Sequence, residues 1–332
     1  MKIIIDAKIP FIRDAIAAVC DCPVYIDGSA ITAEAVRDAD ALVVRTRTRV
    51  DRALLEGSSV SFVATATIGY DHLDTDYLRQ AGIAWTNCPG CNASSVAQYV
   101  RACLLLLAND FRLDLAETVI GVVGHGHVGN RVAALARQLG MTVLVCDPPL
   151  HLPDGVTLDV IAQRADIISF HVPLTRNGSC PTFHLADKAF FRSLRNHPFI
   201  INTSRGDVID EDTLLSTLRD GTIRQAVIDT WANEPFINTD LLHTVYIGTP
   251  HIAGYSADGK VNADNVVISA LCRHFALPVP PVITPPPLPR GFVFTGNPLE
   301  LYDPRRDSNA LKAHPELFEW FRGHYPLRRE SV

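Results

Sequence analysis

The sequence lacks the features that mark membrane, secreted and nucleic-acid-binding proteins. No apolar run is long enough to span a membrane, and Asp6 and Lys8 interrupt the apolar start, so neither a spanning helix nor a signal peptide is expected. The formal net charge is -6, which gives no basic face for a phosphate backbone. We therefore expect a cytoplasmic protein without membrane or nucleic-acid partners.

The cysteines give little indication of disulfides or of a metal. Eight cysteines in a long chain without a signal peptide are expected to be reduced. The pairs Cys20 with Cys22 and Cys88 with Cys91 could contribute to a metal or redox site, but a second properly spaced pair is missing. We favour small buried side chains near turns and predict no metal.

The composition is that of an ordinary globular protein, and the chain shows two series of alternating strands and helices. Hydrophobic residues make up 47% and charged residues 20% of 332 residues, so two domains are expected. In the first series, strands are predicted at 2–6, 41–45, 61–66 and 83–86, and helices at 11–19, 33–39, 51–56 and 75–80. This alternation favours an α/β fold with a parallel, doubly wound sheet.

A second series follows a long apolar helix. That helix is predicted from Ser94 to Asp110, with Ser94 or Ser95 as N-cap and Gln98 completing a capping box. The strands predicted after it, which match a complete dinucleotide-binding fold, are 119–123, 142–146, 167–170, 199–202, 226–228 and 245–247.

The end of the chain is expected to return to the first domain and then leave it. A helix from about 257 to 275 can carry the chain back, and the proline-dominated stretch 277–289 is typical of an extended connector. The predicted divisions are one domain at 1–95 and 257–280, a second at 96–256, and a linker with a C-terminal region at 281–332.

A glycine-rich turn, GHGHVG at 124–129, joins a predicted strand to a helix. Gly124 allows a tight turn, Gly126 lets the backbone approach a pyrophosphate, and Gly129 permits close helix packing. The helix N-terminus attracts phosphate. We therefore predict a dinucleotide site here.

The type of dinucleotide follows from the next strand end. Asp147 lies there, where an acid can accept hydrogen bonds from ribose hydroxyls. Residues 148–153 contain no Arg or Lys to neutralise a 2′-phosphate, so NAD is expected rather than NADP.

Three segments at the ends of late predicted strands carry unlike polar groups: 202–206, 229–235 and 249–255. Arg205 can hold a carboxylate through two parallel hydrogen bonds. His251 can exchange a proton near neutral pH, and Glu234 can orient it and stabilise its imidazolium. Together they suit oxidation of a 2-hydroxy acid, and Asp229 is interpreted as a partner of the nicotinamide carboxamide.

The order of GHGHVG, INTSRGDVIDE, DTWANEP and TPHIAG resembles the D-isomer-specific 2-hydroxy acid dehydrogenase family over nearly all of residues 1–276. The resemblance implies that Arg205, Glu234 and His251 are catalytic. It also implies a flavodoxin-like substrate domain, a Rossmann NAD-binding domain and a short C-terminal dimerisation segment. The cofactor-binding residues given by the motifs and the resemblance are Gly124, Gly126, His127, Val128, Gly129, Asp147, Thr175, Thr203, Ser204, Arg205, Asp229 and Gly254.

Further segments resemble one branch of this family: 43–50, 63–74, 88–100, 249–260 and 324–330. This resemblance implies oxidation of 4-phospho-D-erythronate to (R)-3-hydroxy-2-oxo-4-phosphooxybutanoate in pyridoxal 5′-phosphate (vitamin B6) biosynthesis. It also implies a homodimer held partly by a shortened C-terminal region, and substrate contacts for Thr46, Thr67 and Tyr255.

Residues alone say less about the substrate. If the segment after the strand at 41–45 is extended, Arg45, Arg47 and Arg49 share one face, which could attract an anionic substrate or form a solvated edge. Two alternatives stay open: a phosphoglycerate, glyoxylate or hydroxypyruvate dehydrogenase of the same family, and, more distantly, an NAD(H)-sensing binding protein.

Overall fold

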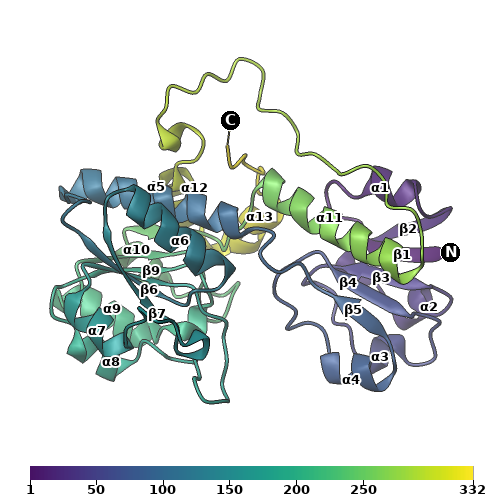
Figure 1. Ribbon diagram of the computed structural model, residues 1–332, viewed down its shortest axis with the longest axis horizontal. Coiled ribbons are helices and arrows are strands. Elements are labelled where there is room, and N and C mark those ends of the chain that lie inside the picture. Colours follow the sequence, from purple (N-terminus) through teal and green to yellow (C-terminus); the bar gives the residue numbers. More distant parts are fainter. Residues whose placement is uncertain (332) are drawn as a thin grey trace. The chain divides into compact units, whose positions relative to one another are not determined.

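The computed structural model describes residues 1–331 and divides into two compact units. The first comprises Met1–Asn92 and Ser256–Arg290, and the second comprises Ala93–Tyr255 and the described residues from Gly291 onward. Each unit is built on one parallel sheet with helices on its faces (Figure 1). The two predicted parallel-sheet α/β domains are confirmed. Among the described residues, no helix is long and apolar enough to cross a membrane.

The first unit has a five-stranded sheet in the order β2-β1-β3-β4-β5, which is the flavodoxin-like order. Its strands are β1 (Lys2–Asp6), β2 (Cys22–Ile26), β3 (Ala41–Val44), β4 (Phe62–Thr65) and β5 (Ala84–Thr86). Sequence analysis missed β2, which contains Pro23. Proline is tolerated there because β2 is an edge strand, paired only with β1.

Short helices connect these strands, and one long helix from late in the chain completes the unit. They are α1 (Arg13–Ala17), α2 (Ala33–Val36), α3 (Arg52–Leu55), α4 (Thr75–Gln80) and α11 (Ala257–His274), with the 3₁₀ turn η1 (Gly28–Ala30). Val267 and Leu271 of α11 are buried in one cluster with Ile5 of β1. Residues 277–289 have no regular secondary structure, and Asn265 exchanges two hydrogen bonds with the backbone of Ile283 in this connector.

The second unit has a six-stranded parallel sheet in the order β11-β10-β9-β8-β6-β7. Its strands are β6 (Val119–Val123), β7 (Thr142–Cys146), β8 (Ile167–Phe170), β9 (Phe199–Asn202), β10 (Gln225–Ile228) and β11 (Ile247–Gly248). The chain reverses direction across the sheet between β6 and β8. Loops at the carboxyl ends of strands around such a reversal are where ligands bind in open α/β sheets.

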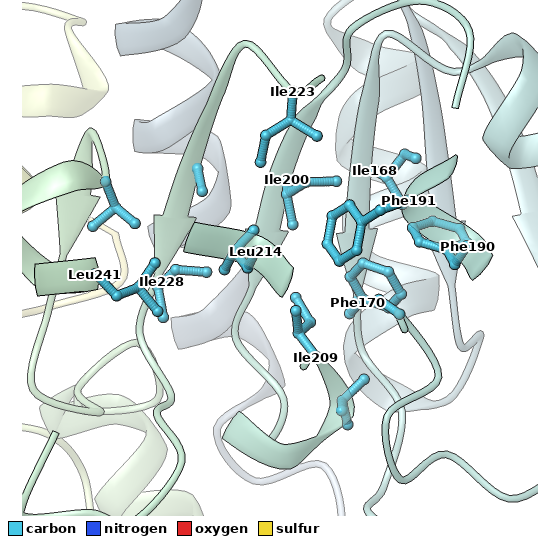
Figure 2. Close-up of a cluster of buried hydrophobic side chains, with 14 of the residues drawn as sticks. Ile168, Phe170, Phe190, Phe191, Ile200, Ile209, Leu214, Ile223, Ile228 and Leu241 are labelled. Atoms are coloured by element: carbon cyan, nitrogen blue, oxygen red, sulfur yellow. The ribbon is translucent and has the colours of Figure 1, made fainter. Parts of the chain in front are cut away.

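Helices cover both faces of this sheet. They are α5 (Ala93–Phe111), α6 (His127–Gln138), α7 (Leu158–Arg164), α8 (Lys188–Ser193), α9 (Glu211–Asp220), α10 (Thr239–Thr244), α12 (Pro304–Ala313) and α13 (Phe318–Gly323), with 3₁₀ turns η2 (Pro148–Leu150), η3 (Gly206–Val208), η4 (Pro298–Glu300) and η5 (Pro315–Leu317). Figure 2 shows one core, where Phe170, Phe191, Ile200 and Leu214 meet. Full burial of one such side chain contributes about 1.5 to 3 kcal/mol.

The C-terminal region differs from the predicted separate division at 281–332. Residues up to Arg290 group with the first unit, and the described residues from Gly291 group with the second. The reason is burial, because Leu311 and Phe318 belong to one core of the second unit and Tyr302 belongs to its other core.

The predicted capping box at the start of α5 is not formed. The Ser95 hydroxyl donates to Glu330 at 2.7 Å, and the Gln98 amide donates to the Arg329 carbonyl at 2.8 Å. Both side chains therefore bind the C-terminal residues instead of the backbone at the start of their own helix. These bonds hold the C-terminal residues against α5.

Candidate active site

The glycine turn between β6 and α6 has the form that a pyrophosphate requires. Gly124 has φ +91°, and a side chain there would lie 2.6 Å from the His171 carbonyl oxygen. A side chain at Gly129 would lie 1.8 Å from the Gly124 carbonyl oxygen, whereas at Gly126 no atom lies within 4 Å. The turn is therefore closed where the helix packs and open where a phosphate would approach the N-terminus of α6.

Residues flanking this turn complete the nucleotide end of the site. Asp147 follows β7 directly, and its carboxylate accepts a 2.6 Å hydrogen bond from the His125 backbone N–H. The carboxylate is thereby fixed beside the glycine turn. His127 opens α6 and is exposed, while Val128 packs against the core beneath the helix. The glycine cradle and the carboxylate of Asp147 beside it fit NAD, and ribose binding by Asp147 stays a prediction.

The loops after β8 and β9 meet through a half-buried histidine. His171 contacts the Ser169 hydroxyl at 2.8 Å and the Thr203 hydroxyl at 3.2 Å. Burial lowers the pKa of His171 to about 3, so the ring is neutral at physiological pH. Thr175 is tied to Thr182 by a 2.8 Å bond from its backbone N–H. Thr175 and Thr203 therefore belong to loops at the same edge of the sheet as Gly124.

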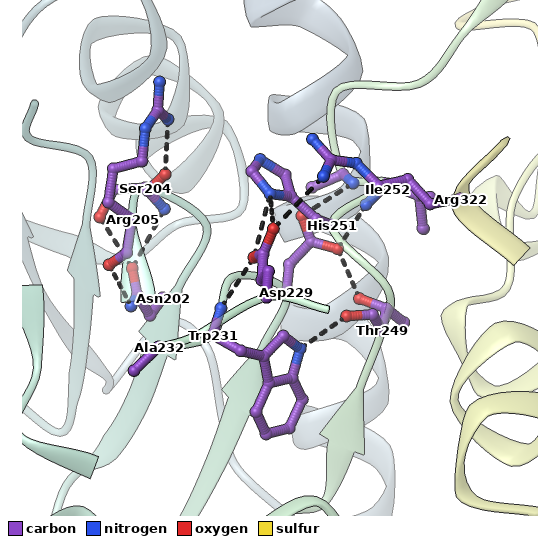
Figure 3. Close-up of polar contacts among 12 residues, drawn as sticks. Asn202, Ser204, Arg205, Asp229, Trp231, Ala232, Thr249, His251, Ile252 and Arg322 are labelled. Carbon is purple, nitrogen blue, oxygen red and sulfur yellow. Dashed lines mark hydrogen bonds and ion pairs between the residues drawn. The ribbon is translucent and has the colours of Figure 1, made fainter. Parts of the chain in front are cut away.

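Glu234 and His251, predicted from separate segments, are in contact. His251 Nδ1 lies 3.0 Å from Oε1 and 2.8 Å from Oε2 of Glu234, and Oε1 also accepts the Trp231 backbone N–H at 3.0 Å (Figure 3). Burial alone would raise the pKa of Glu234, but His251, Arg322 and the Trp231 N–H outweigh it and hold that pKa below its ordinary value. Because both ring contacts use Nδ1, proton exchange with a substrate would use Nε2.

Asp229 holds the loop that carries His251. Its buried carboxylate accepts hydrogen bonds from the Thr249 hydroxyl at 2.7 Å and from the backbone N–H groups of Ile252 at 2.8 Å and Ala253 at 2.9 Å. Burial raises the pKa of Asp229 despite these donors. The structure thus gives Asp229 a bracing role, and its interpretation as a partner of the nicotinamide carboxamide stays a prediction.

Arg205 lies on a loop that packs directly against the Glu234 loop. Asn202 fixes the turn, because its side chain accepts from the Ser204 hydroxyl at 2.7 Å and donates to the Arg205 carbonyl at 2.9 Å. A side chain at Gly206 would lie 1.9 Å from the Trp231 carbonyl carbon. Glycine is therefore needed for the loops bearing Arg205 and Glu234 to approach each other.

Sequence analysis missed two arginines of the C-terminal region. Arg322 of α13 lies 3.4 Å from Oε2 of Glu234. Arg328 is buried, and its guanidinium donates to the carbonyls of Ala253 at 2.6 Å and Tyr255 at 2.9 Å. Gly254 lies between these two carbonyls. The paired arginine in HYPLRRE could have indicated Arg328, but nothing in the sequence states which loop it contacts, and Arg322 precedes that motif and carries no such signal.

The predicted substrate residues divide between the units. Tyr255 lies in the second unit and is half-buried. Its ring meets the ring of Tyr325 edge to face, with 6.1 Å between the two ring centroids. Thr46 and Thr67 lie in the first unit. Thr46 is exposed on a turn, and the Thr67 hydroxyl donates to the Gly69 carbonyl at 2.9 Å. Their predicted contacts with substrate stay predictions.

The expectation that Arg45, Arg47 and Arg49 share one extended face is wrong. The chain turns at residues 46–48, and Arg45 instead pairs with the buried Asp6 at 2.9 Å. An unpaired carboxylate in the sheet would be costly, so Asp6 draws the nearest guanidinium inward.

The cysteine pairs do not assemble. All eight cysteines are free, and no group of three or more metal-ligating side chains occurs among residues 1–331. Burial raises the pKa of the buried Cys88, and that of the half-buried Cys91 to about 11, which makes both thiols poorly reactive. Cys22 is exposed, so the expectation of buried side chains is wrong for that residue.

Comparison with known proteins agrees with this geometry. Residues 102–253 match the family model "D-isomer specific 2-hydroxyacid dehydrogenase, NAD binding domain". The chain is 53% identical to erythronate-4-phosphate dehydrogenase of Bacteroides fragilis, over 100% of this chain and 97% of that protein. It is 42% identical to the protein of that name from Azotobacter vinelandii, over 99% of this chain and 93% of the relative.

A solved structure shares the fold. NAD-bound 3-phosphoglycerate dehydrogenase of Entamoeba histolytica is 25% identical and superimposes with a TM-score of 0.69, over 83% of this chain and 95% of that one. The chain therefore belongs to the NAD-dependent D-isomer-specific 2-hydroxyacid dehydrogenase family, in its erythronate-4-phosphate dehydrogenase branch.

Proposed function

We propose that the protein oxidises 4-phospho-D-erythronate to (R)-3-hydroxy-2-oxo-4-phosphooxybutanoate with NAD, as a step of pyridoxal 5′-phosphate biosynthesis. The observation that carries the proposal is the Glu234–His251 contact, at 2.8 Å, on a loop braced from both sides and beside the loop of Arg205. Relatives at 42–53% identity over the whole chain bear the matching name, which supports this substrate over others of the family.

The residues divide the reaction between them. Arg205 binds the substrate carboxylate through its planar guanidinium and thereby fixes C2. His251 takes the proton of the C2 hydroxyl as the carbonyl forms, and Glu234 stabilises the imidazolium that results. The glycine turn and Asp147 would hold NAD, whose nicotinamide ring would supply the acceptor for the hydride from C2. Tyr255, Thr46 and Thr67 contribute hydroxyls to the polar substrate in this proposal.

We further propose that the protein is a cytoplasmic homodimer whose contact surface includes the C-terminal region. The support is apolar exposure in that region, since Val293 is 74% exposed and Trp320 is 55% exposed. Light scattering on the purified protein should give twice the chain mass, and Trp320→Glu should lower it to one chain. A wild-type monomer would contradict the dimer without affecting the reaction.

Turnover assays test the substrate. Purified protein is incubated with 4-phospho-D-erythronate, NAD and a 2-oxo acid that reoxidises tightly held NADH, and the phosphorylated oxo acid is measured. Formation of that product supports the proposal. Preferred turnover of 3-phosphoglycerate, glyoxylate or hydroxypyruvate would keep the catalytic residues and discard the substrate, whereas NADH binding without turnover would favour an NAD(H)-sensing protein.

A further inference from the structure

Helix α13 presents one residue to the core and one to the catalytic pair. Phe318 is buried in the core of the second unit, and Arg322 lies four residues later on the same face of the helix. Trp320, between them, is 55% exposed on another face. Phe318 therefore anchors the helix in an orientation that brings Arg322 to Glu234.

Arg322 and His251 share one carboxylate oxygen. Oε2 of Glu234 lies 2.8 Å from His251 Nδ1 and 3.4 Å from Arg322 Nη1, while Oε1 also accepts from Trp231 (Figure 3). The Arg322 side chain is only 20% exposed, so water screens its charge weakly. Burial alone would lower the pKa of Arg322, but the neighbouring Tyr255 and Glu234 outweigh it and raise that pKa, so the guanidinium stays charged.

A second contact holds the same C-terminal segment on the catalytic loop. Arg328 donates to the carbonyls of Ile252 at 3.0 Å, Ala253 at 2.6 Å and Tyr255 at 2.9 Å, and its Nε donates to the Gln98 side chain at 2.9 Å. The loop after His251 is thus bound by Asp229 through its N–H groups and by Arg328 through its carbonyls. The C-terminal segment reaches the site at two places.

We propose that Arg322 is a positioning residue for the proposed reaction, which fixes the Glu234 carboxylate beneath His251 and places a positive charge beside this pair. The inference rests on the proposed catalytic roles of Glu234 and His251. Two effects follow from one contact. The guanidinium restricts rotation of the carboxylate that orients the ring. Its positive charge also disfavours a second positive charge on the nearby ring.

Other charged groups also act on Glu234 and His251, and the variants described below leave them unchanged. Asp229 acts on His251, and Glu211 and Arg322 act on Glu234. Tyr255 acts on Arg322, through its charge and a side-chain hydrogen bond. Among them Arg322 is the cation, and it comes from a segment outside the family's motif set. Comparing Arg322→Met with Arg322→Lys therefore separates the charge of the side chain from its geometry.

The experiment compares Arg322→Met, Arg322→Lys and a matched control, Arg305→Met. Arg305 belongs to α12 of the same region and pairs with Asp303 at 2.7 Å. For each variant we would measure kcat and KM for 4-phospho-D-erythronate across pH. We would also follow the titration of His251 by NMR of histidine-labelled protein, with the signal assigned from its absence in His251→Gln.

Arg322→Met should lower kcat about tenfold to a hundredfold with little change in KM. The midpoints of the kcat/KM profile and of the His251 signal should move up by about half a unit to one unit. Arg322→Lys should keep both midpoints and restore part of kcat, and Arg305→Met should match wild type. If Arg322→Met does not fold, Arg322→Lys carries the test, because it keeps the charge but not the planar geometry.

Unchanged kcat and midpoints in Arg322→Met, or displaced midpoints in Arg322→Lys, would overturn the inference. A rise in KM alone would overturn it too, because it would make Arg322 a substrate-binding residue. The NMR titration needs no substrate. A protein that fails to oxidise 4-phospho-D-erythronate therefore refutes the proposed function, while the shift of the His251 midpoint still decides the role of Arg322.

Discussion

His251 Nδ1 lies 2.8 Å from Oε2 of Glu234, and the backbone of His251 that permits this contact has φ +56°. A non-glycine residue in this left-handed region costs about 1 to 3 kcal/mol, which the surrounding structure must offset. Asp229 and Arg328 do so by binding the residues that follow His251. The strain thus sits where orientation of one ring matters for the proposed chemistry.

Replacing His251 tests its role as the base. His251→Gln should lower kcat roughly 10² to 10⁴-fold, since a positioned acid or base contributes about that much. Steady-state kinetics with saturating NAD would measure it. The control is His314→Gln, which removes an exposed histidine that also contacts a glutamate, Glu316, at 3.3 Å. Near-normal turnover of His251→Gln would remove the residue from the reaction.

Arg205→Lys tests recognition of the substrate carboxylate. A lysine ammonium cannot form the two parallel bonds of a guanidinium, so kcat/KM should fall by about tenfold or more. The matched control is Arg219→Lys. Arg219 lies near the end of α9 and forms an exposed ion pair with Asp240 of α10. Equal kcat/KM in wild type and Arg205→Lys would place the substrate carboxylate elsewhere.

Asp147 should set the preference for NAD over NADP. A 2′-phosphate would meet this carboxylate, which the His125 N–H holds at 2.6 Å. Wild type should therefore use NAD with much the higher kcat/KM, and Asp147→Ser should reduce the ratio by roughly tenfold to a hundredfold. Asp154→Ser, an exposed acid farther along the same loop, is the control. Comparable efficiency of wild type with both cofactors would refute the prediction.

Glu211 should make stability depend on pH. Burial raises its pKa to about 7 although it accepts the Ala232 N–H at 2.7 Å, and the pKa of an unfolded glutamate is about 4.3. The folded state therefore binds the proton more tightly, so this contribution to stability is present below about pH 4.3 and is lost as pH rises through about 7.

Glu211→Gln should remove this dependence. Its gain in stability relative to wild type should grow as pH rises between those two values, and should be fully developed by pH 8, at an amount on the order of a few kcal/mol. Urea unfolding at several pH values measures it. As a control, Glu117→Gln replaces an exposed acid of the same unit, and its free energy of unfolding should depend on pH as that of wild type does. A constant difference between Glu211→Gln and wild type at every pH would contradict the prediction.

Local sequence determined most of the strands, though not β2, and the identities of the catalytic candidates. Strands such as 119–123 and 199–202 are continuous apolar runs ended by polar or glycine residues, and such runs are recognisable without any partner. The glycine turn is recognisable locally from its spacing between a strand and a helix, and Gly129 is required by its contact with Gly124, five residues earlier, whereas the contact that requires Gly124 is with the distant His171. Arg205, Glu234 and His251 followed from residue chemistry and family order.

Tertiary structure decided which of several local options each polar side chain takes. Ser95 and Gln98 could cap their own helix, yet they bind the C-terminal residues, and Arg45 turns inward to Asp6 instead of joining a cationic face. The partnership of Arg322 with Glu234 joins residues 88 positions apart. Sequence patterns record periodicity along one segment, whereas such contacts depend on how distant segments pack. The energy of a buried charge depends on which partner lies within reach of it in the folded chain.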